Sequence, residues 1–324
     1  MLSAQAGQMG RLSFDTAETL VYDPVSANRA ATRAALYNLG FRHIETAATL
    51  DAFIECIKRR APDLALCETQ GADDELCTAI QAIRQSTDGY NPFIVLIVTA
   101  WENSTALVSK VLNSGADDLL LRPFSTTLLG QRIRTHVERR KGFVVTSEYV
   151  GPDRRKDNAR PSNVELFEPP NSLKMKAQER LTSDDAAQRL DAQLKSARGQ
   201  LNSEKLRRDS FQVCVLWRLL QSHIPGTGKY EVDLTKLKDL TQSMALRARG
   251  TAFDGATGWC DSVIAAAEGL EAGVDRNASL HLLGHAALNL TQLFVPEKTT
   301  AQHLEEVDAA VAMIAARNAP AMAV

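Results

Sequence analysis

The sequence predicts an α/β protein in which a doubly wound parallel sheet of five strands is followed by an all-α helical domain. The clearest observation is a pair of apolar runs, residues 93–98 and 119–121, separated by a helix-length stretch. Buried-strand runs that alternate with helices are typical of parallel strands. Three similar runs come earlier, whereas residues 182–317 show helix-length periodicity. A chain of 324 residues has room for about two domains on a prior of ~150 residues each.

The N-terminal elements follow from apolar runs and the residues that bound them. Strands are expected at residues 18–23, 41–47, 63–67, 93–98 and 119–121. Helices are expected at residues 27–39, 50–59, 73–85, 102–113 and 127–139. Ser26 and Ser125 are expected N-caps, because a serine hydroxyl accepts a hydrogen bond from a free first-turn N–H. Gly40 and Pro62 end the helices before them, and residues 88–92 form a turn.

The C-terminal half begins with a long helix, because no proline interrupts residues 182–223. Its first part carries a narrow apolar seam of Leu190, Leu194, Ala197 and Leu201. The apolar face is narrow at first and widens towards the end of the helix. This pattern predicts a coiled segment that runs into a helical bundle, and it favours dimerisation through the seam over packing of the seam on its own domain. Further helices are expected at about 232–249, 257–271, 278–293 and 300–317.

Residues 141–181 are predicted to be a linker, because a polar tract punctuated by Pro and Gly without periodicity is typical of extended, mobile chain. Its basic residues are Arg154, Arg155, Lys156 and Arg160. We interpret them as solvated, because four cations bind phosphate only weakly at physiological salt. Phe167 is a candidate for docking on one of the domains. Residues 1–14 and 318–324 are expected to be a flexible N-terminus and a tail.

Composition limits the function classes. A formal net charge of −2 argues against bulk capture of nucleic acid or an anionic membrane, although a local basic patch is compatible with it. Five cysteines without a C-x-x-C pair are expected to be reduced thiols of a cytosolic protein. There is no secretory signal, and no apolar run approaches the ~20 residues of a membrane span. The sequence therefore predicts a cytoplasmic protein.

The text at the strand ends carries a family resemblance. The chain reads TA at 99–100, GADD at 115–118 and RPF at 122–124. This order resembles the T-A, G-A-x-D and K-P-F text of two-component response-regulator receiver domains of the chemotaxis-receiver type, over about residues 15–140. GPDRRK at 151–156 resembles a tail that follows a group of bacterial receiver-like proteins. The C-terminal half resembles no family that we recognise.

The resemblance implies a phosphoryl-accepting pocket, and this chain departs from it at several positions. Glu68 falls on the acceptor aspartate and Arg122 on the lysine. Asp23 keeps one acidic position, Pro24 replaces the other, and Thr99 matches the hydroxyl residue. A carboxylate one methylene further out misplaces the ligand shell of Mg²⁺, and proline supplies no oxygen. We therefore expect a pseudo-receiver with lost or weak Mg²⁺ binding and no other metal or cofactor.

Two interpretations of Glu68 stay open. Its carboxylate either stands permanently in place of a phosphoryl-aspartate, acting through Thr99 and Arg122, or it is a drifted polar residue without a signalling role. Arg122 can make a bidentate pair with it, although arginine differs from a compact ammonium. Leu119 replaces the aromatic that reports phosphorylation. Cys67 is expected to be a core thiol that points to the opposite face.

The resemblance also implies a partner and dimer face, formed by residues 102–113, 117–121 and 127–139. Leu119 and Arg132 lie on it, and we interpret the charges around Arg132, as far as residue 140, as a solvated helix face. Trp101 is either an exposed binding anchor or a cap on the sheet edge, with equal weight.

His281 and His285 are four residues apart, on one helical face. The text around them matches histidine phosphotransfer domains poorly, and a metal site lacks a third ligand. Buried or half-buried structural histidines are the preferred interpretation.

These observations predict a non-enzymatic signalling protein. Its degenerate receiver would bind a histidine kinase, another response regulator or a downstream effector without phosphorylation, while the helical half forms a homodimer or a second surface. The alternative is an active phosphorelay component that accepts a phosphoryl group on a non-standard carboxylate, such as Asp73 or Asp74, or on a C-terminal histidine. Nucleic-acid binding through the linker and bundle is weaker, because no recognition helix is evident.

Overall fold

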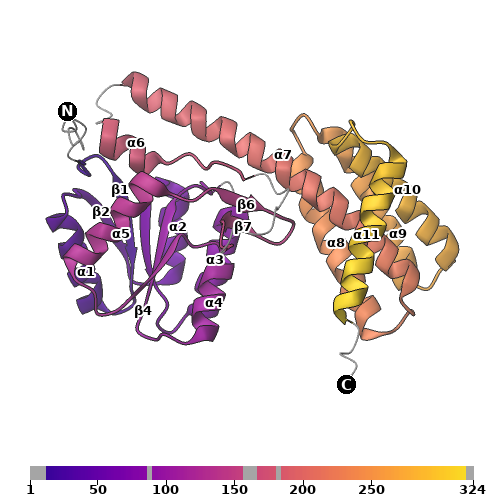
Figure 1. The fold of residues 1–324 in the computed structure, drawn as a ribbon, viewed down its shortest axis with the longest axis horizontal. Helices are drawn as coiled ribbons and strands as arrows, with labels where there is room; N and C mark the ends of the chain where they lie inside the picture. Colours follow the sequence, from indigo (N-terminus) through magenta and orange to yellow (C-terminus); the bar gives the residue numbers. More distant parts are fainter. Residues whose placement is uncertain (1–11, 86–89, 156–165, 180–183, 319–324) are drawn as a thin grey trace, which may run out of the picture. The chain divides into compact units, whose positions relative to one another are not determined.

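The computed structural model describes residues 12–85, 90–155, 166–179 and 184–318 (Figure 1). The chain divides into two compact units, residues 1–199 and 200–324. The boundary between the units lies within a helix, α7 (Asp184–Ser222), and not at residue 182. This helix contributes residues to both units.

A five-stranded parallel sheet forms the centre of the N-terminal unit (Figure 1). Its strands are β1 (Glu18–Tyr22), β2 (His43–Ala47), β3 (Leu64–Glu68), β4 (Val95–Ala100) and β5 (Asp118–Leu121). They pair in the order β2-β1-β3-β4-β5, each parallel to its neighbour. The connecting helices are α1 (Ser26–Asn38), α2 (Leu50–Arg60), α3 (Asp73–Gln85), α4 (Thr105–Asn113) and α5 (Thr126–Arg139). The expected doubly wound sheet is confirmed.

Two apolar layers cover the sheet, because alternate strand residues point to opposite faces. On β3, Leu64 and Leu66 pack with residues of α1 and α5. Ala65 and Cys67 pack with residues of α2, α3 and α4 on the other face. Cys67 is therefore a core thiol, as expected, and burial raises the pKa of its thiol. All five cysteines are free.

One of the two serine caps is wrong. Ser26 is the first residue of α1, and the N-cap is Val25, which offers no side-chain bond. The side chain of Asp23 accepts from the N–H of Val25 at 2.9 Å, so its carboxylate binds the backbone just before the helix and not a first-turn N–H. Ser125 does cap α5, accepting from the N–H of Leu128 at 3.1 Å. Part of the turn expected at residues 88–92 lies outside the described residues.

The expected extended linker is instead largely folded onto the N-terminal unit. Strands β6 (Phe143–Val145) and β7 (Val150–Pro152) form an antiparallel hairpin. Helix α6 (Ser172–Glu179) follows and packs Leu173 and Ala177 into the layer of α1 and α5. The sequence did not predict this folding, because the polar tract holds only a few apolar side chains and they show no periodicity. They are buried only by packing against the rest of the N-terminal unit. Lys156 and Arg160 lie outside the described residues.

Phe167 docks on this unit. It pairs through its backbone with Phe143 and stacks on Phe93 with ring centroids 5.7 Å apart. The hairpin also approaches Gly115, whose φ is +93°. A Cβ there would lie 2.5 Å from the carbonyl oxygen of Val150, so only glycine fits. Arg154 is not solvated, because its guanidinium donates to the carbonyl oxygen of Ala116.

A buried ion network holds the start of β5. Asp117 accepts from Arg84 at 2.6 Å and from Arg140 at 2.9 Å, and all three side chains are buried. Asp117 also accepts from the N–H of Leu96 at 2.9 Å. The interpretation of the charges up to Arg140 as a solvated face is therefore wrong for Arg140. The two guanidiniums outweigh burial and hold the pKa of Asp117 well below its usual range.

The C-terminal unit contains α8 (Gly228–Ala248), η1 (Asp254–Ala256), α9 (Thr257–Glu271), α10 (Arg276–Phe294) and α11 (Thr300–Asn318), after the end of α7 (Asp184–Ser222). The expected all-α architecture is confirmed. Residues of α7 to α11 share one apolar core. Thr227 caps α8 after the break at residues 224–228. Within the described ranges, no helix combines the length and apolarity that a membrane span needs. The start of the long helix expected from residue 182 lies outside the described residues, which resume at residue 184.

A buried carboxylate lies within this core. Asp209 on α7 is fully buried, and the ammonium of Lys205 lies 3.1 Å from its Oδ1. Burial raises the pKa of Asp209 to about 6, against the opposing effect of Lys205.

We expect the Asp117→Asn variant to destabilise the N-terminal unit by about 3–5 kcal/mol, because two buried guanidiniums lose their counter-ion. The depressed pKa of Asp117 means that wild type holds this advantage above about pH 4 and loses it as pH falls further. Hydrogen exchange of the β4 amides measures the difference. Asp118→Asn is the control, because its contacts to Arg132 and His136 are 3.4 Å long, and it should change stability by less than about 1 kcal/mol.

The raised pKa of Asp209 makes the stability of the C-terminal unit depend on pH in the opposite direction. Its protonated form stabilises the folded unit fully below about pH 4, and that contribution is lost as pH rises through about 6. Relative to Asp209→Asn, wild type should lose about 3 kcal/mol between pH 4 and 7. Urea unfolding in a Trp101→Phe background measures this, because Trp217 and Trp259 then report on the C-terminal unit. An equal pH slope in both proteins would contradict the prediction, and exposed Asp239→Asn is the control.

Candidate functional site

The residues matched to the receiver pocket meet at the carboxyl edge of the sheet. Arg122 follows β5, and its Nε lies 2.6 Å from Glu68 Oε2 at the end of β3. Its Nη2 lies 3.0 Å from Asp23 Oδ2, after β1, and 3.1 Å from the hydroxyl of Thr32 on α1. The expected bidentate pair with Glu68 is therefore wrong. Arg122 divides its fork between two carboxylates, because the turn after β1 brings Asp23 within reach of the second nitrogen.

Glu68 is surrounded by donors. β3 and β4 pair in a register that sets Glu68 beside Thr99, whose hydroxyl donates to Glu68 Oε2 at 2.7 Å. The N–H of Gln70 donates to Oε1 at 3.2 Å. Both carboxylates, of Glu68 and Asp23, are fully buried, and the Arg122 side chain is only 8% exposed. A single guanidinium thus serves two buried carboxylates. We call this hydrogen-bonded group the Arg122 cluster: Asp23, Thr32, Glu68, Thr99 and Arg122.

Asp23 is held from several sides. Burial raises the pKa of its carboxyl, while the Val25 N–H and the Arg122 guanidinium oppose that rise. Arg29 on α1 donates to the carbonyl oxygen of Asp23 at 2.6 Å. Pro24, which replaces the second acidic residue, is exposed and offers no side-chain oxygen. Sequence matching missed Thr32, since a buried threonine within an alanine-rich helix carries no distinguishing signal.

These residues do not fit a Mg²⁺ ion. Mg²⁺ needs oxygen ligands in near-octahedral geometry at about 2.0–2.1 Å. One oxygen of each carboxylate, Asp23 and Glu68, is bound by the Arg122 guanidinium, which places a positive charge where the ion would need to approach. Among the residues that the structure describes, no group of three His, Cys, Asp or Glu side chains could hold a metal.

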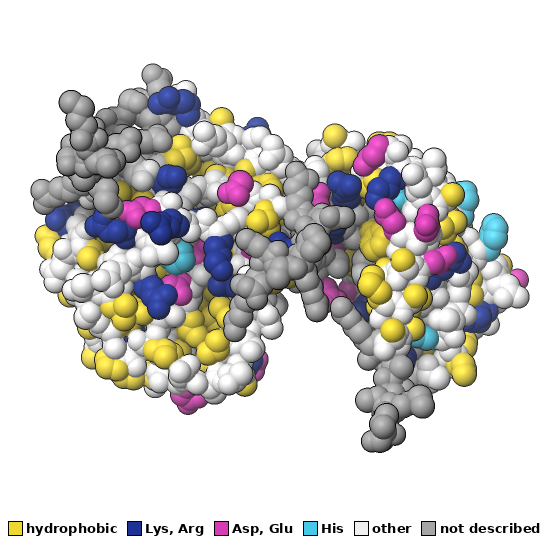
Figure 2. Space-filling view, viewed as in Figure 1, with side chains coloured by type: hydrophobic (Ala, Val, Ile, Leu, Met, Phe, Trp, Pro, Cys, Tyr) yellow, Lys and Arg dark blue, Asp and Glu magenta, His cyan; other side chains and the backbone are white. Residues whose placement is uncertain are grey.

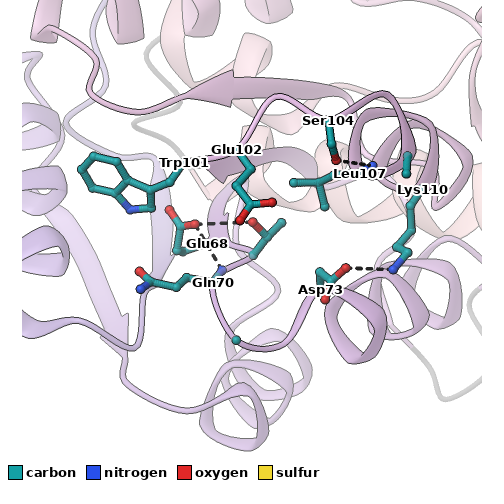
Figure 3. A pocket seen from close by; sticks show the side chains of 11 residues that line it. Glu68, Gln70, Asp73, Trp101, Glu102, Ser104, Leu107 and Lys110 are labelled. Carbon is teal, nitrogen blue, oxygen red and sulfur yellow. Dashed lines mark hydrogen bonds and ion pairs between the residues drawn. The ribbon is translucent and has the colours of Figure 1, made fainter.

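A cavity of about 370 Å³ opens beside the Arg122 cluster. Figure 3 shows Glu68 and Glu102 among the side chains that line it, with the Trp101 ring on one side. The Trp101 side chain is 50% exposed while lining the cavity, so it combines features of both roles considered for it.

The opposite wall of the cavity is an ion pair between α3 and α4. Lys110 lies 2.8 Å from Asp73 and 2.7 Å from Asp74. The hydrogen bond from Lys110 lowers the pKa of Asp73, and the two carboxylates raise that of Lys110. The carboxylates considered as non-standard acceptors are thus already paired with a cation.

Two sets of predicted residues lie apart from the Arg122 cluster. Leu119 is half-buried against the layer of α2 to α4, and Arg132 is an exposed neighbour of Asp118 at 3.4 Å. On α10, His281 and His285 are exposed, so the preferred interpretation as buried histidines is wrong. The apolar face of α10 at Leu283, Ala286 and Ala287 faces the core and turns both histidines outward. Figure 2 shows histidine side chains at the surface of this unit.

We expect Arg122→Met to destabilise the N-terminal unit by about 3–5 kcal/mol at pH 7, because it leaves two buried carboxylates without a cation. Arg122 opposes the rise that burial causes in the pKa of Asp23. That pKa should therefore rise further in the variant, and the deficit should shrink as pH falls toward 5. Hydrogen exchange of the β3 amides reports the change. Arg132→Met is the matched control, and a deficit that grows at low pH would contradict the explanation.

No protein-family model matches the sequence, and no curated protein matches it. Among solved structures, the chain is similar to a CheY-like response regulator receiver domain from Methanospirillum hungatei JF-1, with 23% identity, 36% of this chain and 90% of that chain covered, and a TM-score of 0.33.

It is also similar to the signal receiver domain of the putative response regulator NarL from Mycobacterium tuberculosis, with 21% identity, 37% and 94% covered, and a TM-score of 0.33. A two-component response regulator from Clostridium difficile has 22% identity, 38% and 98% covered, and a TM-score of 0.34. Such values carry no information about chemistry or partners. The N-terminal unit has the receiver fold, because its strand order and its alternation of strands and helices are those of that fold.

Proposed function

We propose that this chain is a response-regulator-like signalling protein whose N-terminal unit binds partner proteins without phosphoryl transfer, and that it is not an enzyme. The observation that carries the proposal is the fork of Arg122, which joins the buried carboxylates of Glu68 and Asp23. Both carboxylates are buried and hydrogen-bonded to Arg122, so neither is free to attack the phosphorus of a phosphoryl donor.

The contacts of Thr99 favour the interpretation of Glu68 as a permanent stand-in. In this structure the Thr99 hydroxyl donates to Glu68 Oε2 at 2.7 Å, an oxygen that also accepts from Arg122. One carboxylate oxygen thereby gathers the hydroxyl and the cation that the receiver resemblance assigns to a phosphoryl group. Glu68 thus holds both residues in one arrangement, without a covalent modification that could be reversed.

Partners of the proposed module are a histidine kinase, another response regulator or a downstream effector. The face formed by α4, β5 and α5 exposes Leu121 and Leu128, in addition to Arg132. The C-terminal unit would dimerise or add a second surface. Leu190, Ala197 and Leu201 of the seam are buried in the single chain, and the homodimer stays a prediction.

A second candidate is a phosphorelay component that carries the phosphoryl group on a C-terminal histidine. The exposure of His281 and His285 on α10 favours it, since a phosphotransfer histidine must be reachable. His285 also packs edge-on against Trp259, with ring centroids 5.5 Å apart, which leaves His281 as the more accessible of the two.

Intact-mass analysis after incubation with acetyl phosphate and Mg²⁺ tests both candidates. We expect no adduct on wild type, because the Arg122 cluster offers neither a free acceptor nor a Mg²⁺ shell. Glu68→Asp, Pro24→Asp, Arg122→Lys in one chain is the repaired control, and its adduct would prove the conditions competent. An adduct on wild type would overturn the proposal. If that adduct is acid-labile and lost in His281→Ala, the second candidate takes its place.

A further inference from the structure

A groove runs along the exposed face of α1. It encloses about 520 Å³ and is lined by Ser26, Arg29, Ala30, Arg33, Ala34, Tyr37, Asn38 and Thr46. We call it the α1 groove. Every residue of its lining comes from α1 except Thr46, which lies on β2. The sequence of α1 contains two arginines and no acidic residue, so the groove has a positive wall.

The basic and aromatic side chains of the groove form a row. Arg29, Arg33 and Tyr37 are successive positions four apart, and neighbours at this spacing share one helical face. The rise of an α-helix places them about 6 Å apart along the axis. Ala30 and Ala34 lie between them and keep the floor of the groove low, so the backbone of a bound segment can approach.

One end of the groove is preorganised. The guanidinium of Arg42 lies 4.4 Å from the centre of the Tyr37 ring. The same group donates to the carbonyl oxygens of Tyr37 and Phe41, each at 3.0 Å. Tyr37 is nevertheless 57% exposed. An exposed tyrosine whose position is already held by an arginine loses little entropy on binding, and Tyr and Arg are the residues most enriched at binding hot spots.

The middle of the groove carries a charge without a counter-ion. Within the part of the chain that the structure describes, Arg33 forms no ion pair. Glu45, on the neighbouring strand β2, is engaged by Arg59 and Arg60 at 2.6 Å and 3.2 Å. The positive charge of the groove is therefore not neutralised from within its own surface.

The inner side of α1 is fixed by the Arg122 cluster. Thr32 accepts from Arg122 on the buried face of the helix, and Arg29 donates to the backbone of Asp23. Arg29 belongs to both surfaces, because it lines the groove while one of its guanidinium nitrogens is bound to Asp23. The spacing of Arg29 and Arg33 is set by the helix.

We propose that the α1 groove binds an acidic segment of a partner protein, whose carboxylates recur at about one helical turn. A row of separated cations matches carboxylates repeated along a peptide, whereas a single phosphate cannot reach from Arg29 to Tyr37. Nucleic acid is disfavoured, because so few cations give weak binding to a phosphate backbone at physiological salt. The inference deepens the proposed binding role by naming the chemistry of a partner, and it rests on that role.

The probe is a fluorescein-labelled alanine-based helical peptide with glutamates at positions i, i+4 and i+8. A peptide with glutamines at those positions is its control. Fluorescence anisotropy with the full chain, at about 50 mM and about 150 mM salt, should show at least about tenfold tighter binding of the glutamate peptide. Arg33→Glu should weaken that binding about tenfold or more, and Tyr37→Ala should also weaken it.

Arg155→Glu, just after β7, makes the same charge change at another exposed arginine of this unit, and should leave the affinity within about twofold. Equal binding of both peptides, equal loss in Arg33→Glu and Arg155→Glu, or no binding of the glutamate peptide at about 1 mM would overturn the inference. So would a single-stranded oligonucleotide that binds as tightly as the glutamate peptide and depends equally on Arg33. The peptide experiment and the phosphorylation test can fail independently. If the glutamate peptide does not bind, the result of the incubation with acetyl phosphate still stands.

Discussion

The contact on which the carboxyl edge of the sheet depends is the guanidinium of Arg122 between two buried carboxylates. Through Glu68 and Asp23 it joins the ends of β3 and β1, and through Thr32 it reaches α1. Replacing such a pair by apolar residues is often neutral, whereas removing one partner is costly. The cluster is therefore better understood as a constraint on geometry than as a source of stability. It specifies one arrangement of the strand ends and excludes others.

The strand β5 is held at both of its ends by arginine networks. Asp117, just before it, receives Arg84 and Arg140, and Arg122, just after it, enters the carboxylate cluster. A four-residue edge strand has little pairing of its own to hold its register. The ion networks supply that register from α3 and from the residue that follows α5, and the hairpin of β6 and β7 closes over the Asp117 end through Gly115. The tail after α5 is thus part of the N-terminal unit.

The two surfaces of α1 connect this internal constraint to binding. In the proposed function, the Arg122 cluster takes the place of the free acceptor and the metal shell that a phosphorylated receiver needs. Binding by such a unit would not depend on phosphorylation. The α1 groove, with its arginines and its held tyrosine, is the surface that we propose for it.

Sequence alone determined the local elements and the placement of the pocket residues, because both depend on patterns within a short stretch of chain. Apolar periodicity located the strands and helices, Gly40 ended α1, and the matched text brought Asp23, Glu68, Thr99 and Arg122 to one edge. Only tertiary structure decided how those residues pair. The division of the Arg122 fork depends on distances between residues far apart in the chain, and the outward turn of His281 and His285 depends on which face of α10 meets the core. The hairpin and α6 were hidden for the same reason: their apolar residues are too few to show a pattern, and they are stabilised only by a surface that the rest of the chain has to fold to provide.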